Sequence, residues 1–217
     1  MKDEARITIT PTLLLHAYAS GVFPMADSAE SPELRWIDPA RRGVLPLDRL
    51  HVSRRLARSF LAGGFEIAVN RDFAAVLDGC ADRPATWINP EIRELYLTLH
   101  RLGHAHSVEV RSAGALAGGL YGVALGGAFF GESMFSRARD ASKFALIALV
   151  ARLRAGGFAL LDTQFVTPHL MRLGAVEISR AEYRRRLDAA LLRPARFLTL
   201  PETTPLQGLL QLSTQTS

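Results

Sequence analysis

One carboxylate of this chain stands in an unusually apolar stretch. Glu132 lies within residues 129–135, whose other side chains are mainly aromatic or thioether groups, and a basic stretch follows at 137–143. Burying a bare charge is costly, so such an acid must be paired, protonated or ready to receive a cationic ligand. Further along, the apolar residues 160–161 are followed by Asp162 and Gln164. We predict that these two segments form a catalytic cleft.

Asp162 and Gln164 are separated by one residue at the end of a predicted strand, so their side chains should share a face. A neutral amide is a poor base by itself. A neighbouring carboxylate could polarise the amide, or could itself take the proton from an attacking amine, and the residues leave this choice open. The alternative is that Asp162 accepts hydrogen bonds from backbone amides of the following turn. For Glu132, the alternative is a salt bridge to Arg137 or Arg139.

A predicted sheet in the second part of the chain must position these side chains. Alternating and apolar runs predict strands, and 3.6-residue periods with capping residues predict helices. The order is a strand at 65–70, helices at 72–80 and 89–102, strands at 106–111, 116–123 and 128–134, a helix at 140–154, a strand at 158–162, a helix at 168–173, a strand at 176–178 and a helix at 181–192. This order predicts an α+β fold and resembles the GNAT acetyltransferase fold.

Strict alternation along the strand at 128–134 would place Glu132 and Met134 on one face and Phe129 on the other. A β-bulge near Gly131 would bring all three side chains to one cleft, because a bulge inserts a residue and redirects the side chains that follow. Such a bulge would be needed if the three residues line one cleft.

The first sixty residues have a different character. Thr10-Pro11 starts a helix that ends near Gly21, and residues 24–50, which contain four prolines, are expected to be loop with short extended pieces. A helix at 53–62 ends at Gly63-Gly64. We predict a small N-terminal subdomain at 1–62, a GNAT-like transferase domain at 63–195 and a loosely held C-terminal tail at 196–217.

Composition limits the classes of function. The chain has 217 residues, of which 48% are hydrophobic, and one cysteine, Cys80, which suits a reducing compartment. The acidic start at residues 1–4 does not resemble a signal peptide, and no apolar run is long enough to span a membrane. We predict a soluble, cytoplasmic protein. The net charge of +5 comes mostly from clustered arginines, which suit a polyanion such as RNA but equally a solvated helix face.

The GNAT-like order of elements suggests acetyl-CoA as a possible donor, but the sequence of one loop disfavours it. Acetyltransferases of that fold bind the coenzyme A pyrophosphate with a loop of the type Arg/Gln-x-x-Gly-x-Gly/Ala. The corresponding segment here, residues 136–143, contains no glycine. Ordinary acetyl-CoA binding is therefore disfavoured.

Matching blocks in one order along the chain give a more specific indication. They lie at 21–25, at Trp36 and 42–45, at 86–88, 102–110, 118–124, 131–136 and 141–143, and at Asp162, Gln164, His169 and 173–175. In these blocks the chain resembles the bacterial leucyl/phenylalanyl-tRNA–protein transferases. The resemblance implies transfer of leucine or phenylalanine from its tRNA to an N-terminal lysine or arginine of a protein, which creates an N-degron and marks the protein for degradation. It also implies that no coenzyme and no metal are needed.

The resemblance further implies roles for individual residues. Glu132 would receive the α-ammonium group of the aminoacyl donor, and Asp162 and Gln164 would be catalytic. Trp36 and Trp87 would border the site and contact the terminal adenosine or the aminoacyl ring. An apolar pocket for the donor side chain would be lined by Leu120, Phe129, Met134, Leu146, Leu149 and Leu161.

Each of these apolar residues, taken singly, is more often plain core, and both tryptophans could instead be core anchors between the two domains. Phosphates of the tRNA 3′ end could meet the helix N-terminus near Asp140, together with Arg137, Arg139 and Lys143. A non-catalytic RNA-binding protein is the remaining alternative. The chain departs from the family pattern at Arg35 and at Thr167-Pro168, and the latter lies where the acceptor should enter.

Overall fold

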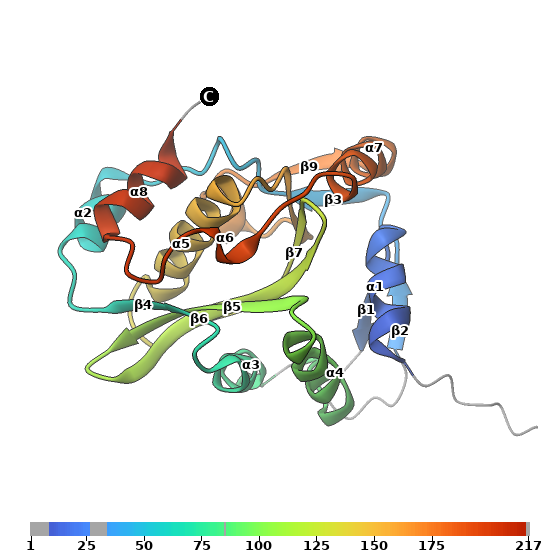
Figure 1. Cartoon of the computed structure of the whole chain (residues 1–217), viewed down its shortest axis with the longest axis horizontal. Coiled ribbons are helices and arrows are strands. Elements are labelled where there is room, and N and C mark those ends of the chain that lie inside the picture. Colours follow the sequence, from blue (N-terminus) through green and yellow to red (C-terminus); the bar gives the residue numbers. More distant parts are fainter. Residues whose placement is uncertain (1–8, 27–33, 85, 216–217) are drawn as a thin grey trace, which may run out of the picture.

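A mixed seven-stranded sheet lies between two layers of helices (Figure 1). These elements belong to residues 9–26, 34–84 and 86–215, which are the residues that this computed structural model describes. Two short strands pair separately from the main sheet. The strands are β1 Phe23–Ala26, β2 Leu34–Ile37, β3 Arg41–Val44, β4 Glu66–Val69, β5 Ala105–Ser112, β6 Ala115–Leu125, β7 Ala128–Ser136, β8 Leu160–Gln164 and β9 Val176–Ser179.

Seven of the described helices follow the sequence prediction closely, whereas the two that follow residue 195 were not predicted. The helices are α1 Pro11–Ala19, α2 Arg54–Leu61, α3 Phe73–Ala81, α4 Pro90–Arg101, α5 Ala141–Ala155, α6 Pro168–Met171, α7 Arg180–Leu191, the 3₁₀ helix η1 Phe197–Thr199 and α8 Leu206–Thr214. The mixed α+β class is thereby confirmed. The start of the chain at 1–4, on which the prediction of no signal peptide rested, lies outside the described residues.

Capping explains where the helices begin. The Thr10 hydroxyl accepts a hydrogen bond from the Leu13 amide, and Pro11 occupies the first turn, as expected. Ser53 and Asn89 cap α2 and α4 in the same way. Asp140 stands at the N-terminus of α5, but its side chain makes no capping bond there. Asp140 therefore does not cap α5 through its side chain, although its position before the predicted helix suggests such a cap.

The main sheet has the strand order β4-β5-β6-β7-β8-β3-β9. Among its described strands, β7 and β8 are parallel and all other neighbours are antiparallel. The short extended pieces expected within 24–50 are β1, β2 and β3. Sequence pattern did not indicate that β3 would enter the main sheet between β8 and β9, because its pairing depends on partners more than a hundred residues away. The predicted division at residue 62 stays a prediction.

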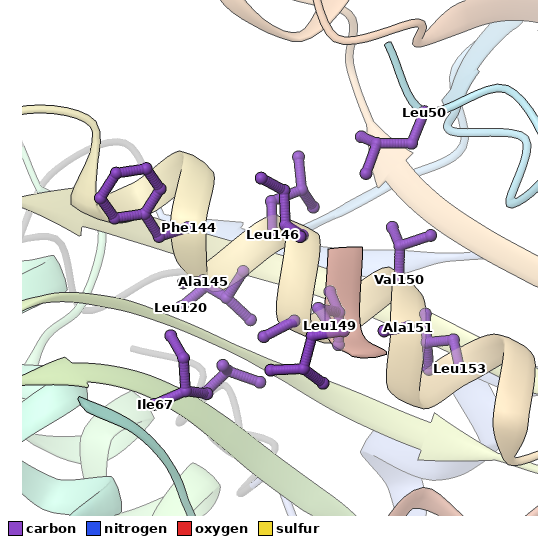
Figure 2. Close-up of a cluster of buried hydrophobic side chains, with 14 of the residues drawn as sticks. Leu50, Ile67, Leu120, Phe144, Ala145, Leu146, Leu149, Val150, Ala151 and Leu153 are labelled. Carbon is purple, nitrogen blue, oxygen red and sulfur yellow. The ribbon is translucent and has the colours of Figure 1, made fainter. Parts of the chain in front are cut away.

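Each face of the sheet carries its own core. On one face, α2, α5 and α8 cover the sheet, and on the other lie α1, α3, α4 and α7. Helix α5 is buried around most of its circumference, and its Leu146 and Leu149 belong to the same core cluster as Leu120 of β6 (Figure 2). Burial of so many aliphatic side chains is the main stabilising contribution to such a layered fold.

The expectation of a loosely held tail is wrong for the part that forms α8. Leu209 of α8 is only 2% exposed and belongs to the core formed with α5. The buried Arg152 guanidinium of α5 donates to the Leu200 carbonyl at 2.7 Å, which ties the preceding loop to the same helix. The proline-, threonine- and glutamine-rich composition hid an apolar face at 206, 209, 210 and 212.

No helix in the described ranges is both long and apolar enough to cross a bilayer.

We predict that Leu209→Ala destabilises the protein by about 2–5 kcal/mol, because it leaves a cavity between α8 and α5. Urea unfolding followed by circular dichroism measures the change. The control is Leu192→Ala, at a leucine that is 87% exposed, which should alter the free energy of unfolding by less than about 0.5 kcal/mol. Equal, small effects of the two variants would contradict the packing of α8.

Candidate active site

The predicted bulge exists in β7, and Glu132 is the residue that it inserts. Tyr121 of β6 pairs with Ser133, but the next residue, Gly122, pairs with Gly131, so Glu132 has no partner across the ladder. A Cβ atom at Gly122 would lie 2.2 Å from the Phe130 carbonyl oxygen, which only glycine avoids. The bulge frees the Glu132 side chain from strict alternation.

Three side chains donate hydrogen bonds to the Glu132 carboxylate. Oε1 accepts from the Tyr18 hydroxyl at 2.8 Å and from the Gln164 amide nitrogen at 3.0 Å, and Oε2 accepts from the Tyr96 hydroxyl at 2.9 Å. The two tyrosine hydroxyls are themselves 2.6 Å apart. Because these donors come from α1, α4 and β8, three distant segments of the chain converge on one acid.

The alternative salt bridges to Glu132 are not present. Arg137 instead pairs with Asp82 at 3.6 Å, and Arg139 with Asp140 at 3.7 Å. Within residues 9–26, 34–84 and 86–215, no cation pairs with Glu132. Burial raises the pKa of Glu132 to about 7, since the loss of hydration outweighs the hydrogen bonds from the two tyrosines and Gln164, and the nearby Asp162 charge adds to the rise. An acid in this state is suited to an incoming cation.

A second carboxylate, Asp162, is fully buried and already satisfied. It accepts from Arg42 Nε at 2.9 Å and Nη2 at 2.6 Å, from the Tyr183 hydroxyl at 2.7 Å and from the Gln164 backbone amide at 2.8 Å. The Arg42 guanidinium also lies 4.4 Å from the ring centres of both Phe23 and Tyr183. Asp162 therefore does accept a hydrogen bond from a backbone amide of the following turn, which was the alternative role considered for it.

The turn after Asp162 orients Gln164. Gln164 has a φ of +60°, a left-handed conformation that costs free energy in residues other than glycine. The hydrogen bond from its backbone amide to Asp162 holds this conformation, and its side chain turns toward Glu132. The carboxylate that contacts the Gln164 amide group is thus Glu132, whereas Asp162 contacts the Gln164 backbone.

A pocket of about 300 Å³ opens beside Glu132. Strands β7 and β8 pair only at 128–130 and 160–162 and then separate, β7 staying with β6 and β8 with β3. Residues from both separated segments line the pocket, with α5 closing one side. The expected residues that line it are Leu120, Glu132, Met134, Leu146, Leu149 and Leu161. Phe129, which was also expected, is fully buried behind the wall and stacks against Phe197.

The structure brings only one of the two tryptophans near Glu132. The Trp87 ring makes an edge contact with Tyr96, at 6.2 Å between ring centres, and Tyr96 in turn holds Glu132. Trp36 lies opposite Pro24 in the β1–β2 pair and is 40% exposed. Neither tryptophan lines the pocket. An exposed Trp36 does not fit the alternative of a core anchor.

The three predicted phosphate-binding residues gather around the start of α5. Arg137 and Arg139 are exposed, and Lys143 Nζ lies 2.6 Å from the Asp140 carboxylate. The ion pair with Lys143, together with Arg55 at 3.1 Å, lowers the pKa of Asp140. This carboxylate therefore neutralises part of the basic surface that the sequence indicated.

Sequence reasoning missed several residues of the site. Tyr18 and Tyr96 looked like core aromatic residues, and Arg42 and Tyr183 carried no local signal of their distant partner. Arg83 also reaches the pocket, where its guanidinium donates a hydrogen bond to the Ser133 hydroxyl. Further residues at the wall are Tyr121, Thr163, Phe165, Thr167, His169 and Leu170. Among the described side chains, the buried Tyr121 and Thr163 hydroxyls have no hydrogen-bond partner.

The described residues contain no group of three or more histidine, cysteine or acidic side chains placed to hold a metal ion.

Comparison with known proteins identifies the family of this chain. The sequence model of the leucyl/phenylalanyl-tRNA protein transferases matches residues 44–188, and the model of their N-terminal domain matches residues 8–40. The chain belongs to the leucyl/phenylalanyl-tRNA protein transferase family. A leucyl/phenylalanyl-tRNA–protein transferase of Ruegeria pomeroyi is 61% identical over 97% of this chain and 100% of its own length. One from Rhodopseudomonas palustris is 57% identical over 95% of this chain and 94% of its own.

Solved structures give a weaker likeness. The C-terminal domain of a putative lysylphosphatidylglycerol synthetase from Agrobacterium fabrum has a TM-score of 0.42 and 11% identity, covering 83% of this chain and 62% of that one. L-PGS from Bacillus licheniformis has a TM-score of 0.41 and 16% identity, covering 63% of this chain and 51% of that one. Likenesses this low support no argument, and the GNAT-like fold is not confirmed.

Arg42 of this family member should be essential for stability. We expect Arg42→Met to destabilise the protein by about 3–5 kcal/mol, because Asp162 would remain buried without its cation. The double variant Arg42→Met/Asp162→Leu should recover most of that loss, since it removes both charges. Urea unfolding measures both. As a control, Arg101→Met breaks an exposed 2.6 Å pair with Glu94 and should cost less than about 1 kcal/mol.

Glu132 should control the dependence of donor binding on pH. Below pH 7 the carboxylate gains a proton and loses its attraction for an ammonium group, so affinity for an aminoacyl donor should fall as the pH drops through about 7. Tyr18→Phe removes a hydrogen bond that stabilises the carboxylate, so the fall in affinity should occur at a higher pH. Tyr121→Phe, at a hydroxyl without a partner, should leave the pH of this fall unchanged. If Tyr18→Phe also leaves it unchanged, the titration belongs to another group.

Proposed function

We propose that this chain transfers leucine or phenylalanine from aminoacyl-tRNA to the α-amine of an N-terminal arginine or lysine, creating an N-degron. The observation that carries the proposal is a semi-buried carboxylate, Glu132, held by three donors at the wall of an apolar pocket. An aminoacyl donor presents an α-ammonium group and a hydrocarbon side chain from the same carbon. The two halves of this pocket complement those two features.

The pocket supports leucine and phenylalanine as the transferred groups. Its apolar lining includes five leucine side chains and Met134, and a methionine side chain adapts to ligands of different shape. Each methylene of the donor contributes about 1–3 kcal/mol to discrimination in a pocket of this kind, so small side chains would bind weakly. A donor whose amine is blocked could not neutralise Glu132.

The reaction needs positioning more than strong acid or base catalysis. A neutral amine attacks the ester carbon, the C–N bond forms, the bond to the ribose 3′-oxygen breaks, and the proton lost by nitrogen is gained by that oxygen. Placing the amine against an activated ester provides much of the rate enhancement. Gln164 is placed to do so, because its amide nitrogen is fixed on Glu132, while no partner for its amide oxygen is found among the described residues. That oxygen would accept a hydrogen bond from the attacking amine.

Asp162 supports the reaction through Gln164. Its carboxylate is saturated by Arg42, Tyr183 and the Gln164 backbone, so it has no free position for a substrate proton. We therefore assign Gln164 as the catalytic residue and Asp162 as the residue that positions it. Trp87, through Tyr96, and the more distant Trp36 remain proposed contacts of the donor.

The same proposal includes the wider features predicted from the sequence. Arginine and lysine acceptors rest on the family resemblance, and action in the cytoplasm rests on the single cysteine, Cys80, which suits a reducing compartment. A GNAT-like fold is supported by the order of one strand, two helices, three strands, a helix and a strand. The division into 1–62, 63–195 and 196–217 is proposed with it.

Mass spectrometry of a peptide beginning with arginine or lysine, incubated with leucyl-tRNA, should show one added leucine at its N-terminus. Parallel peptides that begin with aspartate or glutamate test the acceptor. Gln164→Ala should lower kcat about 10²–10³-fold, as the loss of a positioned polar group does elsewhere, while donor affinity changes little. Gln211→Ala, on the exposed side of α8, is the matched control. An unmodified peptide, with the donor intact, would refute the proposed function.

A further inference from the structure

A second pocket, of about 410 Å³, adjoins the first and is strongly basic. His169 lines both pockets, which places them side by side. The second pocket lies between the first turns of α2 and α5 and the end of α6. Its other lining residues are His51, Ser53, Arg55, Leu56, Lys143, Arg172 and Leu173.

The charges in this pocket are not balanced. Three cations, Arg55, Lys143 and Arg172, face one carboxylate, Asp140, which pairs with Arg55 at 3.1 Å and with Lys143 at 2.6 Å. Among the residues with described positions, Arg172 has no acidic partner. Burial lowers the pKa of His169, and the positive charges of Lys143 and Arg172 lower it further, so this ring is mostly uncharged at pH 7. The pocket therefore keeps a net positive charge that an anion would neutralise.

The charge also indicates which substrate would enter. An acceptor that begins with arginine or lysine would be repelled by Arg55, Lys143 and Arg172. The aminoacyl-tRNA, by contrast, carries a phosphodiester on the 5′ side of its terminal adenosine, and only one ribose separates it from the ester. When the aminoacyl group fills the first pocket, this phosphodiester is held close to it, and the basic pocket shares the wall residue His169 with the first pocket.

We propose that this basic pocket binds the phosphodiester backbone of the tRNA 3′ end, with Arg172 as its principal free cation and Arg55 and Lys143 as further contacts. The inference rests on the proposed function, and it adds Arg55, Arg172 and a defined pocket to the basic residues indicated by sequence. Binding of this kind is independent of base sequence, and its affinity falls as salt rises.

Three donors of increasing length test the proposal. They are leucine esterified to adenosine, which has no phosphate, leucine on the dinucleotide cytidylyl-adenosine, which has one, and leucyl-tRNA. Arg172→Gln should raise KM for the dinucleotide donor and Kd for tRNA on the order of tenfold, as for loss of a charged hydrogen bond. It should leave kcat and KM for leucyl-adenosine unchanged. The slope of log affinity against log salt should become shallower by about 0.7.

Two further variants serve as controls. Arg172→Lys keeps the charge and should retain most of the affinity for tRNA. Arg193→Gln removes an exposed arginine outside both pockets and should have a smaller effect on the dinucleotide donor than Arg172→Gln.

Several results would overturn the proposal. If Arg172→Gln impairs transfer from leucyl-adenosine as much as transfer from the longer donors, Arg172 belongs to the aminoacyl site instead. A change confined to KM of the acceptor peptide would assign the pocket to the acceptor, and no change with any donor would leave the pocket without a role. Failure of the proposed function is separate, because it would appear as absence of peptide product from the wild-type chain, while Kd and its salt dependence still report on the pocket.

Discussion

The hydrogen-bonded burial of Glu132 is the constraint on which the site depends. A carboxylate removed from water is unstable unless donors replace its hydration. Here the donors are Tyr18 of α1, Tyr96 of α4 and Gln164 of β8. Because each lies on a different element, the acid is correctly placed only when the N-terminal helix, the helical layer and the sheet have assembled. The raised pKa of Glu132 indicates that the three donors replace only part of its lost hydration. A bound ammonium group would provide the remaining stabilisation of the charge.

A second charged centre fixes the geometry of the first. Arg42 and Asp162 form a buried pair that also holds the backbone of Gln164 in its left-handed turn. Buried pairs contribute little net stability, but the loss of one partner is severe, so they specify a structure strongly. The two centres have different structural roles. Asp162 fixes the backbone of Gln164, and Glu132 orients the side-chain amide of Gln164. This division explains why the two acids have different roles.

The sequence predicted most of the fold and the apolar half of the site. Alternation, helical periods and the capping residues Thr10, Ser53 and Asn89 are local signals, and the elements that they indicate are present. Gly131, next to Glu132, marked the position of a possible bulge. The partners of the two acids left no such signal, since Tyr18 and Tyr96 are indistinguishable from core tyrosines until the chain folds. The insertion of β3, which carries Arg42, likewise depends on contacts distant in sequence. Phe129 was placed in the pocket by the family resemblance, but it is fully buried behind the wall and stacks against Phe197.

The separation of β7 from β8 joins these features into one mechanism of site formation. Two parallel strands that stayed paired along their length would close the space in which the pocket lies. The bulge at Glu132 and the tight turn at 162–165 end their pairing after three residues on each strand. Each irregularity costs free energy locally, and each also presents one of the two polar side chains that meet in the hydrogen bond between Gln164 and Glu132. The same departures from regular sheet structure thus create the hollow and place Glu132 and Gln164 beside it, while the leucines of α5 supply its apolar wall.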